Sequence, residues 1–279
     1  QGVAVAERAY QQALAYAQDR KQGRAVGAPA ASPIIEHPDV KRMLLEMRAK
    51  TAAGRALCLV TAAALDRYHR LEGAEEKRIA HEEASMLTPV AKAFSTDIGI
   101  EVASTGVQIH GGMGFVEETG AAQHYRDARI LAIYEGTNGI QAIDLVMRKL
   151  PLSNGERVKA MIAGYRQSAK EAKTINDPGF VRVGERLEAA VDALERATDF
   201  MLENLKSAPN TALAGATPYL RLFALASGGA YLADQALASR AALATGDSDP
   251  AHTTRIRDAR FFAENLAAGA SGLEYAIFD

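Results

Sequence analysis

One glutamate, Glu135, lies in a stretch whose composition suits proton transfer. The uncharged run Leu131-Ala-Ile-Tyr134 precedes it, and Gly136 follows it. A carboxylate that is desolvated among apolar neighbours has a raised pKa and can remove a weakly acidic proton, such as one α to a carbonyl, at neutral pH. Gly136 leaves room for a substrate against the backbone. The same residues also permit a plainer interpretation, in which Glu135 is an exposed glutamate beside a turn at the start of a helix.

A second group of residues suits the binding of an anionic ligand. The segment Gln108-Ile-His-Gly-Gly-Met-Gly-Phe115 places three glycines just after a helical pattern. One glycine is the ordinary cap of a helix end. Three glycines, at 111, 112 and 114, indicate instead a close approach of the backbone to a ligand such as a pyrophosphate.

An arginine near the N-terminus has the right chemistry for the same ligand. Val3, Ala6, Tyr10 and Ala13 recur at helical spacing, and this helix is predicted to run into Tyr16-Ala-Gln-Asp-Arg-Lys-Gln-Gly23. Cations before a terminal glycine are ordinary at a helix end. The planar guanidinium of Arg20 could also bind a phosphate in bidentate fashion.

Taken together, these segments resemble the acyl-CoA dehydrogenases. The resemblance rests on Tyr-Ala-x-x-Arg-x-x-Gly at Tyr16, Gln-x-x-Gly-Gly at Gln108, and the run from Tyr125-Arg-Asp-Ala to Tyr134-Glu-Gly-Thr-Asn138. It implies that Glu135 removes the α-proton of an acyl-CoA while the β-hydrogen leaves as hydride to flavin N5, giving a trans-2-enoyl-CoA. It also implies that Tyr134 and Gly136 contact the substrate, and that the backbone N–H of Glu135 and a ribityl hydroxyl bind the thioester carbonyl.

The resemblance further implies an FAD site, and the residues that match it in this sequence are Arg20, Gln22, His37, Gln108, Gly111, Gly112, Thr137 and Asn138. In the family, the arginine and the glycine turn bind the FAD of the neighbouring subunit. His37 is equally well explained as a structural histidine in a turn. Thr137 and Asn138 also suit the N-cap of the helix that follows, and both roles can hold together.

The predicted fold is all-α in two domains. Residues 1–150 resemble the family's C-terminal four-helix bundle, and residues 157–279 resemble the extra helical domain of large bacterial members, which include the 3-methylmercaptopropionyl-CoA dehydrogenases and long-chain enzymes. The family's N-terminal helical domain and β-domain have no counterpart in the sequence. We therefore expect a C-terminal fragment that is inactive and free of FAD when isolated.

Periodicity predicts where the helices lie. Long amphipathic helices are expected from Asp39 onward and over 75–109, and a shorter one after Asn138. The turn residues Pro151 to Glu156 predict the domain boundary, and helices are expected beyond it from Val158, around Leu187, and over about 216–243 and 251–276. The run His81-Glu82-Glu83 is interpreted as a solvated helix face.

Composition excludes several classes of protein. The net charge of -2 and the pI near 6.4 give no basic stripe for nucleic acid. The single cysteine, Cys58, favours a reducing compartment, here the bacterial cytoplasm, and the histidines have no metal-binding spacing. The stretch 219–239 is long enough for a membrane span, but its charged residues and Gly228-Gly229 favour a buried helix, kinked or split at the glycines.

The family also implies partners. Electrons would pass to an electron-transferring flavoprotein, and the shared FAD site implies a homodimer or a dimer of dimers. Apolar residues on more than one helix face, such as Leu57, Leu59 and Val60, agree with such an assembly. Two other functions stay open: an acyl-CoA oxidase, distinguished by reaction of the reduced protein with oxygen, and a non-catalytic helical module, distinguished by the absence of flavin.

Overall fold

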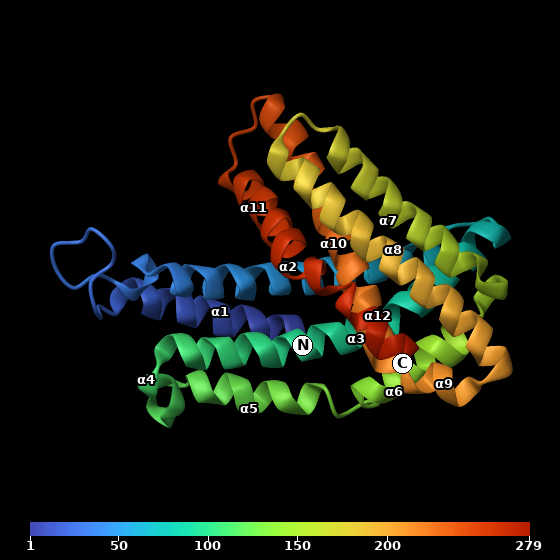
Figure 1. The fold of residues 1–279 in the computed structure, drawn as a ribbon, viewed down its shortest axis with the longest axis horizontal. Helices are drawn as coiled ribbons and strands as arrows, with labels where there is room; N and C mark the ends of the chain where they lie inside the picture. The colour runs from blue at the N-terminus through green and yellow to red at the C-terminus, as the bar shows by residue number, and fades with distance from the viewer. The chain divides into compact units, whose positions relative to one another are not determined.

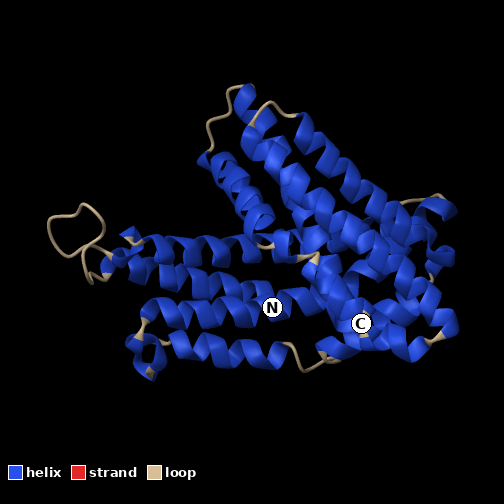
Figure 2. Ribbon diagram, in the orientation of Figure 1, coloured by secondary structure: helices blue, strands red, loops and turns tan.

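The computed structural model describes all residues, 1–279, and the fold is helical throughout, with one isolated β-bridge between Lys21 and Pro33 and no strand (Figure 2). The α-helices are α1 (Gly2–Asp19), α2 (Pro38–Arg70), α3 (Ala74–His110), α4 (Gly112–Phe115), α5 (Ala121–Leu131), α6 (Asn138–Asp144), α7 (Glu156–Thr174), α8 (Pro178–Ser207), α9 (Pro209–Ala214), α10 (Ala216–Ala244), α11 (Pro250–Asn265) and α12 (Gly272–Phe278). Short 3-10 or π turns link several of them: η1 (Ile34–Glu36), η2 (Glu117–Thr119), η3 (Leu145–Lys149), η4 (Leu152–Gly155) and η5 (Ala267–Gly269). The predicted all-α class is confirmed.

The chain forms two compact units, which do not follow the chain order. Unit 1 comprises residues 1–52 and 95–135, and unit 2 comprises residues 53–94 and 136–279. The long helices α2 and α3 contribute to both units. A division of the chain at residues 151–156 stays a prediction.

Unit 1 is a four-helix arrangement of α1, the first part of α2, the last part of α3, and α5 (Figure 1). Its core is built around small side chains on α1, which allow close helix packing: Ala6, Ala9, Ala13 and Ala17, with Leu44, Met47, Val102 and Ala128 from the other helices. Two polar links cross the bundle. Lys50 pairs with Glu101 at 2.7 Å, and His124 Nε2 lies 2.8 Å from the Gln12 amide oxygen.

Unit 2 is dominated by α7, α8, α10 and α11, whose buried aromatic residues Tyr219, Phe223 and Phe262 are fully covered. The hydroxyl of Tyr219 forms a hydrogen bond of 2.8 Å with Thr198 on α8. The helix α10 is continuous from Ala216 to Ala244, so it is not split at Gly228-Gly229; a kink there stays a prediction. No helix is long and apolar enough to cross a membrane.

Two predicted helix ends are also wrong. The first helix stops at Asp19, and Arg20 is extended, because the following loop pairs with itself through Gln22 N to Ser32 O at 3.1 Å and Ile34 N to Arg20 O at 2.8 Å. The helix predicted over 251–276 ends at Asn265, and a 3-10 turn and α12 follow it. By contrast, the predicted buried stripe of α3 is confirmed, and it consists of Ala84, Leu87, Val90, Ala91, Phe94 and Ile98.

The interpretation of His81-Glu82-Glu83 as a solvated face fails at Glu82, whose residue is only 7% exposed. Its carboxylate accepts hydrogen bonds from Ser153 Oγ at 2.8 Å and Arg78 Nη1 at 2.6 Å, and it pairs with Arg157 at 3.4 Å. Burial alone would raise the pKa of Glu82, but hydrogen bonds from Ser153 and Arg78 outweigh burial and lower it. The segment after Pro151, where Ser153 and Asn154 have positive φ, is therefore fixed to α3.

We expect Glu82→Gln to lower the free energy of unfolding by about 1–3 kcal/mol at pH 7, because a buried carboxylate that accepts charged hydrogen bonds is lost. The lowered pKa in the folded state means that this stabilisation is complete above about pH 5 and is lost as the pH falls through the folded-state pKa. Urea denaturation at pH 7 and at about pH 3 measures the effect. The control Glu185→Gln, at an exposed position on α8, should change stability by less than about 0.5 kcal/mol. An undiminished loss at the lower pH would contradict the expectation.

Candidate functional site

A cavity of about 460 Å³ lies at the junction of α1, η1 and the end of α3. We call it the glycine-turn cavity, and its lining residues are Tyr16, Arg20, Gln22, Ile34, Ile109, His110, Gly111, Gly112 and Met113. Four of the predicted cofactor residues, Arg20, Gln22, Gly111 and Gly112, thus meet in one place although they are far apart in the sequence.

The backbone of Arg20 is extended, and this residue forms part of the cavity wall. The guanidinium donates to the Gln22 side-chain oxygen at 3.0 Å, and both residues are exposed. His37 Nε2 donates to the Gln22 carbonyl at 2.8 Å. His37 therefore has an observed structural contact in the turn, and its predicted cofactor role stays a prediction.

Two lining residues of the cavity, Tyr16 and His110, were not identified as site residues from the sequence. The rings of Tyr16 and His110 stack with centroids 4.3 Å apart. His110 is buried, and its Nδ1 donates to the Gly106 carbonyl at 2.7 Å, which fixes the ring. Their positions, four residues before Arg20 and directly before Gly111, are the signal by which they could have been found.

Different structural reasons explain the presence of glycine at positions 111, 112 and 114. Gly111 has φ +61°, and a Cβ added to Gly111 or Gly112 would meet nothing within 4 Å, so their backbone is open to a ligand. At Gly114 an added Cβ would lie 2.3 Å from the Val107 carbonyl oxygen, so packing against α3 explains this glycine. A ligand role for Gly114 is thus not needed to explain the glycine, and it stays a prediction. Gln108 is exposed on the last turn of α3, and its carbonyl accepts from Gly111 N at 3.0 Å.

Glu135 lies at the other end of α5, an eleven-residue helix about 16 Å long, so the structure does not bring it to the glycine-turn cavity. After Leu131 the backbone makes a turn in which Ile133 N and Tyr134 N both donate to the Ile130 carbonyl. Glu135 then adopts φ +54° and Gly136 φ +86°. The left-handed conformation costs a non-glycine residue about 1–2 kcal/mol.

The surroundings of Glu135 differ from the sequence expectation. Leu131 and Ala132 are buried, but Ile133 is 45% exposed and Glu135 is exposed. Glu135 is therefore accessible to solvent in these 279 residues. The predicted apolar pocket around Glu135 is wrong for these 279 residues.

The residues that follow Glu135 begin α6. Thr137 is the N-cap, with Oγ1 accepting from Ile140 N at 3.3 Å, as predicted. Asn138 is the first residue of the helix, and its amide is held on both sides by α3. Its nitrogen donates to the Ala93 carbonyl at 3.2 Å, and its oxygen accepts from Lys92 Nζ at 2.8 Å. Lys92 was not identified from the sequence.

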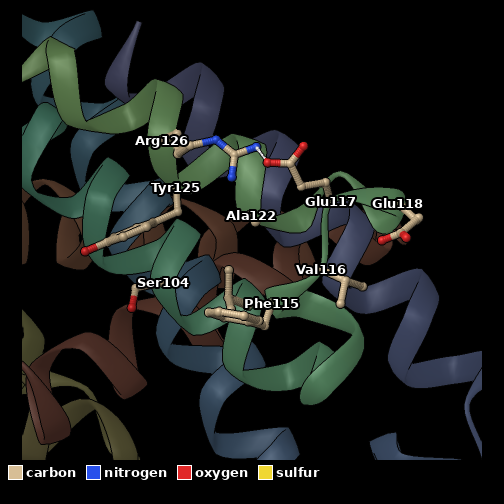
Figure 3. A pocket seen from close by; sticks show the side chains of 9 residues that line it. Ser104, Phe115, Val116, Glu117, Glu118, Ala122, Tyr125 and Arg126 are labelled. Carbon is tan, nitrogen blue, oxygen red and sulfur yellow. Dashed lines mark ion pairs between the residues drawn. The ribbon is translucent and has the colours of Figure 1, made fainter.

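A second cavity, of about 840 Å³, lies between α3, η2 and α5 (Figure 3). Its walls include the aromatic rings of Phe115 and Tyr125 and the apolar side chain of Val116. Arg126 faces Glu117 at its rim, with 3.5 Å between the charged groups. Phe115 is 83% exposed, so this surface presents a large apolar side chain to its surroundings.

Comparisons with known proteins agree with this architecture. Residues 1–150 match the family model of the acyl-CoA dehydrogenase C-terminal domain, and residues 156–278 match a model described as acetyl-CoA dehydrogenase C-terminal like. The chain is 45% identical over its whole length to 3-methylmercaptopropionyl-CoA dehydrogenase of Ruegeria pomeroyi, of which it covers 47%. It is 29% identical to a butyryl-CoA dehydrogenase of Syntrophomonas wolfei, in an alignment that covers 96% of this chain and 45% of that protein.

The fold is also shared with solved structures. An acyl-CoA dehydrogenase from Bacillus anthracis, complexed with FAD, matches 98% of this chain and 46% of its own with a TM-score of 0.73. The sequence identity is 20%, so this likeness concerns the fold alone. The chain spans about half the length of the curated relatives that it matches. Because one family model covers residues 1–150 and a relative with 45% identity aligns over the entire chain, the chain belongs to the acyl-CoA dehydrogenase family.

Proposed function

We propose that this chain is the C-terminal part of an FAD-dependent acyl-CoA dehydrogenase that converts acyl-CoA thioesters to trans-2-enoyl-CoA. The observation that carries the proposal is the left-handed turn at Glu135 and Gly136, in a member of this family. Strained backbone at a non-glycine residue persists where the surrounding structure holds it, and such residues cluster at active sites. Butyryl-CoA and 3-methylmercaptopropionyl-CoA, named for two relatives, are the first substrates to assay.

Glu135 is the proposed general base, which takes the α-proton of the thioester. Its backbone N–H donates to the thioester carbonyl and stabilises the negative charge that develops there. Tyr134 and Gly136 are proposed to flank the acyl group, since they border the base on both sides. FAD, when bound, accepts the β-hydrogen with two electrons, and an electron-transferring flavoprotein is the proposed acceptor from the reduced enzyme.

The residues of the glycine-turn cavity fit the pyrophosphate of FAD. Arg20 provides an exposed cationic fork, and Gly111 and Gly112 leave their backbone open on the same cavity. We propose Gln22, His37 and Gln108 as further cofactor residues next to this cavity, and Thr137 and Asn138 as cofactor residues beside the base. The cavity and Glu135 lie at opposite ends of α5. We therefore propose that the cavity binds the FAD of a neighbouring subunit. The isolated chain is expected to purify without FAD.

Arg20→Ala, made in the longest natural polypeptide that contains this chain, should raise the Kd for FAD about 10- to 100-fold, because a charge-assisted bidentate contact is removed. Arg20→Lys should recover only part of the affinity, since an ammonium lacks the planar fork. Equilibrium dialysis with flavin absorbance measures both. Arg24→Ala is the matched control, at an exposed position of the same loop, and should leave the Kd within about twofold. Unchanged FAD affinity in Arg20→Ala would remove this residue from the site.

Glu135→Gln in the same polypeptide should retain FAD and acyl-CoA binding but lose turnover by on the order of a thousandfold or more, because the amide cannot accept the α-proton. Turnover is followed by reduction of the flavin absorbance on mixing with acyl-CoA. Glu203→Gln, at an exposed position on α8, is the control and should keep full activity. More than a tenth of the parent activity in Glu135→Gln would show that another group is the base.

We propose a homodimer, or a dimer of dimers, built through residues 1–150. The support is a set of exposed apolar side chains in unit 1, three of which, Phe115, Val116 and Tyr125, line one cavity. The others are Met113, Ile130 and Ile133. Leu59 is likewise 63% exposed, whereas Leu57 is buried and Val60 is half-buried, so these apolar residues lie on more than one face of α2, as expected from the sequence. The bacterial cytoplasm is the proposed compartment, in keeping with the exposed free thiol of Cys58.

Phe115→Asp should raise the dimer dissociation constant roughly tenfold or more, because a large apolar side chain at the proposed interface becomes charged. Tyr275→Asp is the matched control, since Tyr275 is 73% exposed but lies outside residues 1–150, and it should leave dimerisation unchanged. Light scattering across a dilution series measures both. A parent protein that is monomeric at every concentration would rule out the shared cofactor site.

A further inference from the structure

The backbone directly after the proposed base is attached to a side chain of α3. Lys92 Nζ donates to the Gly136 carbonyl at 2.8 Å and to the Asn138 side-chain oxygen, also at 2.8 Å. The Ala93 carbonyl accepts from the Asn138 nitrogen at 3.2 Å. The Lys92 ammonium and the Ala93 carbonyl, both on α3, thus hold the chain at Gly136 and at Asn138.

The turn needs such an attachment because its conformation is unfavourable without one. Glu135 and Gly136 both have positive φ, and Glu135 is not a glycine. Just beyond them, Thr137 is committed to α6, through Gln141 N to Thr137 O at 3.0 Å and Ile140 N to Thr137 Oγ1. The Gly136 carbonyl is therefore the group next to Glu135 through which α3 can fix the direction of the peptide.

We infer that Lys92 is a positioning residue for the proton transfer: it holds the Gly136 carbonyl and thereby keeps Glu135 in the left-handed conformation that aims its carboxylate and N–H at the thioester. The inference rests on the proposed function. The observed contacts of Lys92 are with the turn, to Gly136 and Asn138, so the inferred role acts through the geometry of Glu135.

The chemistry of lysine suits this role. An ammonium has three donors on a compact charge and can serve two oxygens at once. Lys92 is half-buried on a long helix, so its position is set by the fold. If the attachment is lost, Glu135 can relax toward negative φ, and small misplacements of a reacting group lower the rate far more than they lower substrate affinity.

The test compares Lys92→Met with Lys92→Arg in the longest natural polypeptide that contains this chain, loaded with FAD. We expect Lys92→Met to lower kcat about 10- to 100-fold, to leave the KM for acyl-CoA within about threefold, and to enlarge the kinetic isotope effect of an α-deuterated substrate. Lys92→Arg should restore kcat to within about threefold. Lys170→Met, at an exposed position on α7, is the matched control and should change none of these values.

The result that overturns the inference is a folded Lys92→Met protein with kcat within twofold of the parent and an unchanged isotope effect. A loss of thermal stability without a change in kcat would likewise show a merely structural role. If Lys92→Met does not fold, Lys92→Gln retains a donor at this position, and the same two criteria apply to it with a smaller expected loss of kcat.

Failure of the inference can be separated from failure of the proposed function. Glu135→Gln, measured in parallel, tests the base itself. If that variant keeps activity, the proposed role of Glu135 as the base fails, and with it the catalytic part of the inference. Amide hydrogen exchange of residues 133–138 then still reports the attachment, because Lys92→Met should accelerate exchange there and Lys170→Met should not. Unchanged exchange in Lys92→Met would overturn the attachment as well.

Discussion

The left-handed backbone at Glu135 and Gly136 is the constraint on which the candidate active site depends. It forms the link between the end of α5 and the start of α6, and the division into two units falls between Glu135 and Gly136. The turn is fixed on both sides of this link. The Ile130 carbonyl accepts from two successive amides on one side, and α3 holds Asn138 on the other. The backbone of Glu135 is thereby restricted to the left-handed region.

A second constraint shapes the glycine-turn cavity. The loop after α1 is not a helix, because the Gln22 amide and the Arg20 carbonyl pair with Ser32 and Ile34, ten and fourteen positions further along the chain. This pairing leaves Arg20 extended, so the guanidinium lines the cavity next to Gln22. The stacked rings of Tyr16 and His110 also line the cavity. The proposed anion binding therefore depends on where α1 ends as much as on the presence of the arginine.

The sequence predicted most of the helices, because burial of one helix face leaves a periodic pattern that needs no knowledge of partners. It also predicted the N-cap at Thr137, a local interaction. What it missed depends on contacts between distant residues. The sequence pattern around Glu82 does not reveal its contact with Ser153. The pattern around Lys92 likewise does not reveal its hydrogen bond to the Gly136 carbonyl. Gly114 matched a cofactor motif, yet its packing against α3 explains it.

The exposure of Glu135 determines what else the proposed reaction requires. A carboxylate is an effective base toward an α-proton when desolvation brings its pKa toward the working pH. The 279 residues provide the left-handed turn and the backbone N–H but leave the carboxylate open to water. In the proposed reaction, the bound thioester would cover the carboxylate, while the turn sets the direction of the carboxylate and of the backbone N–H.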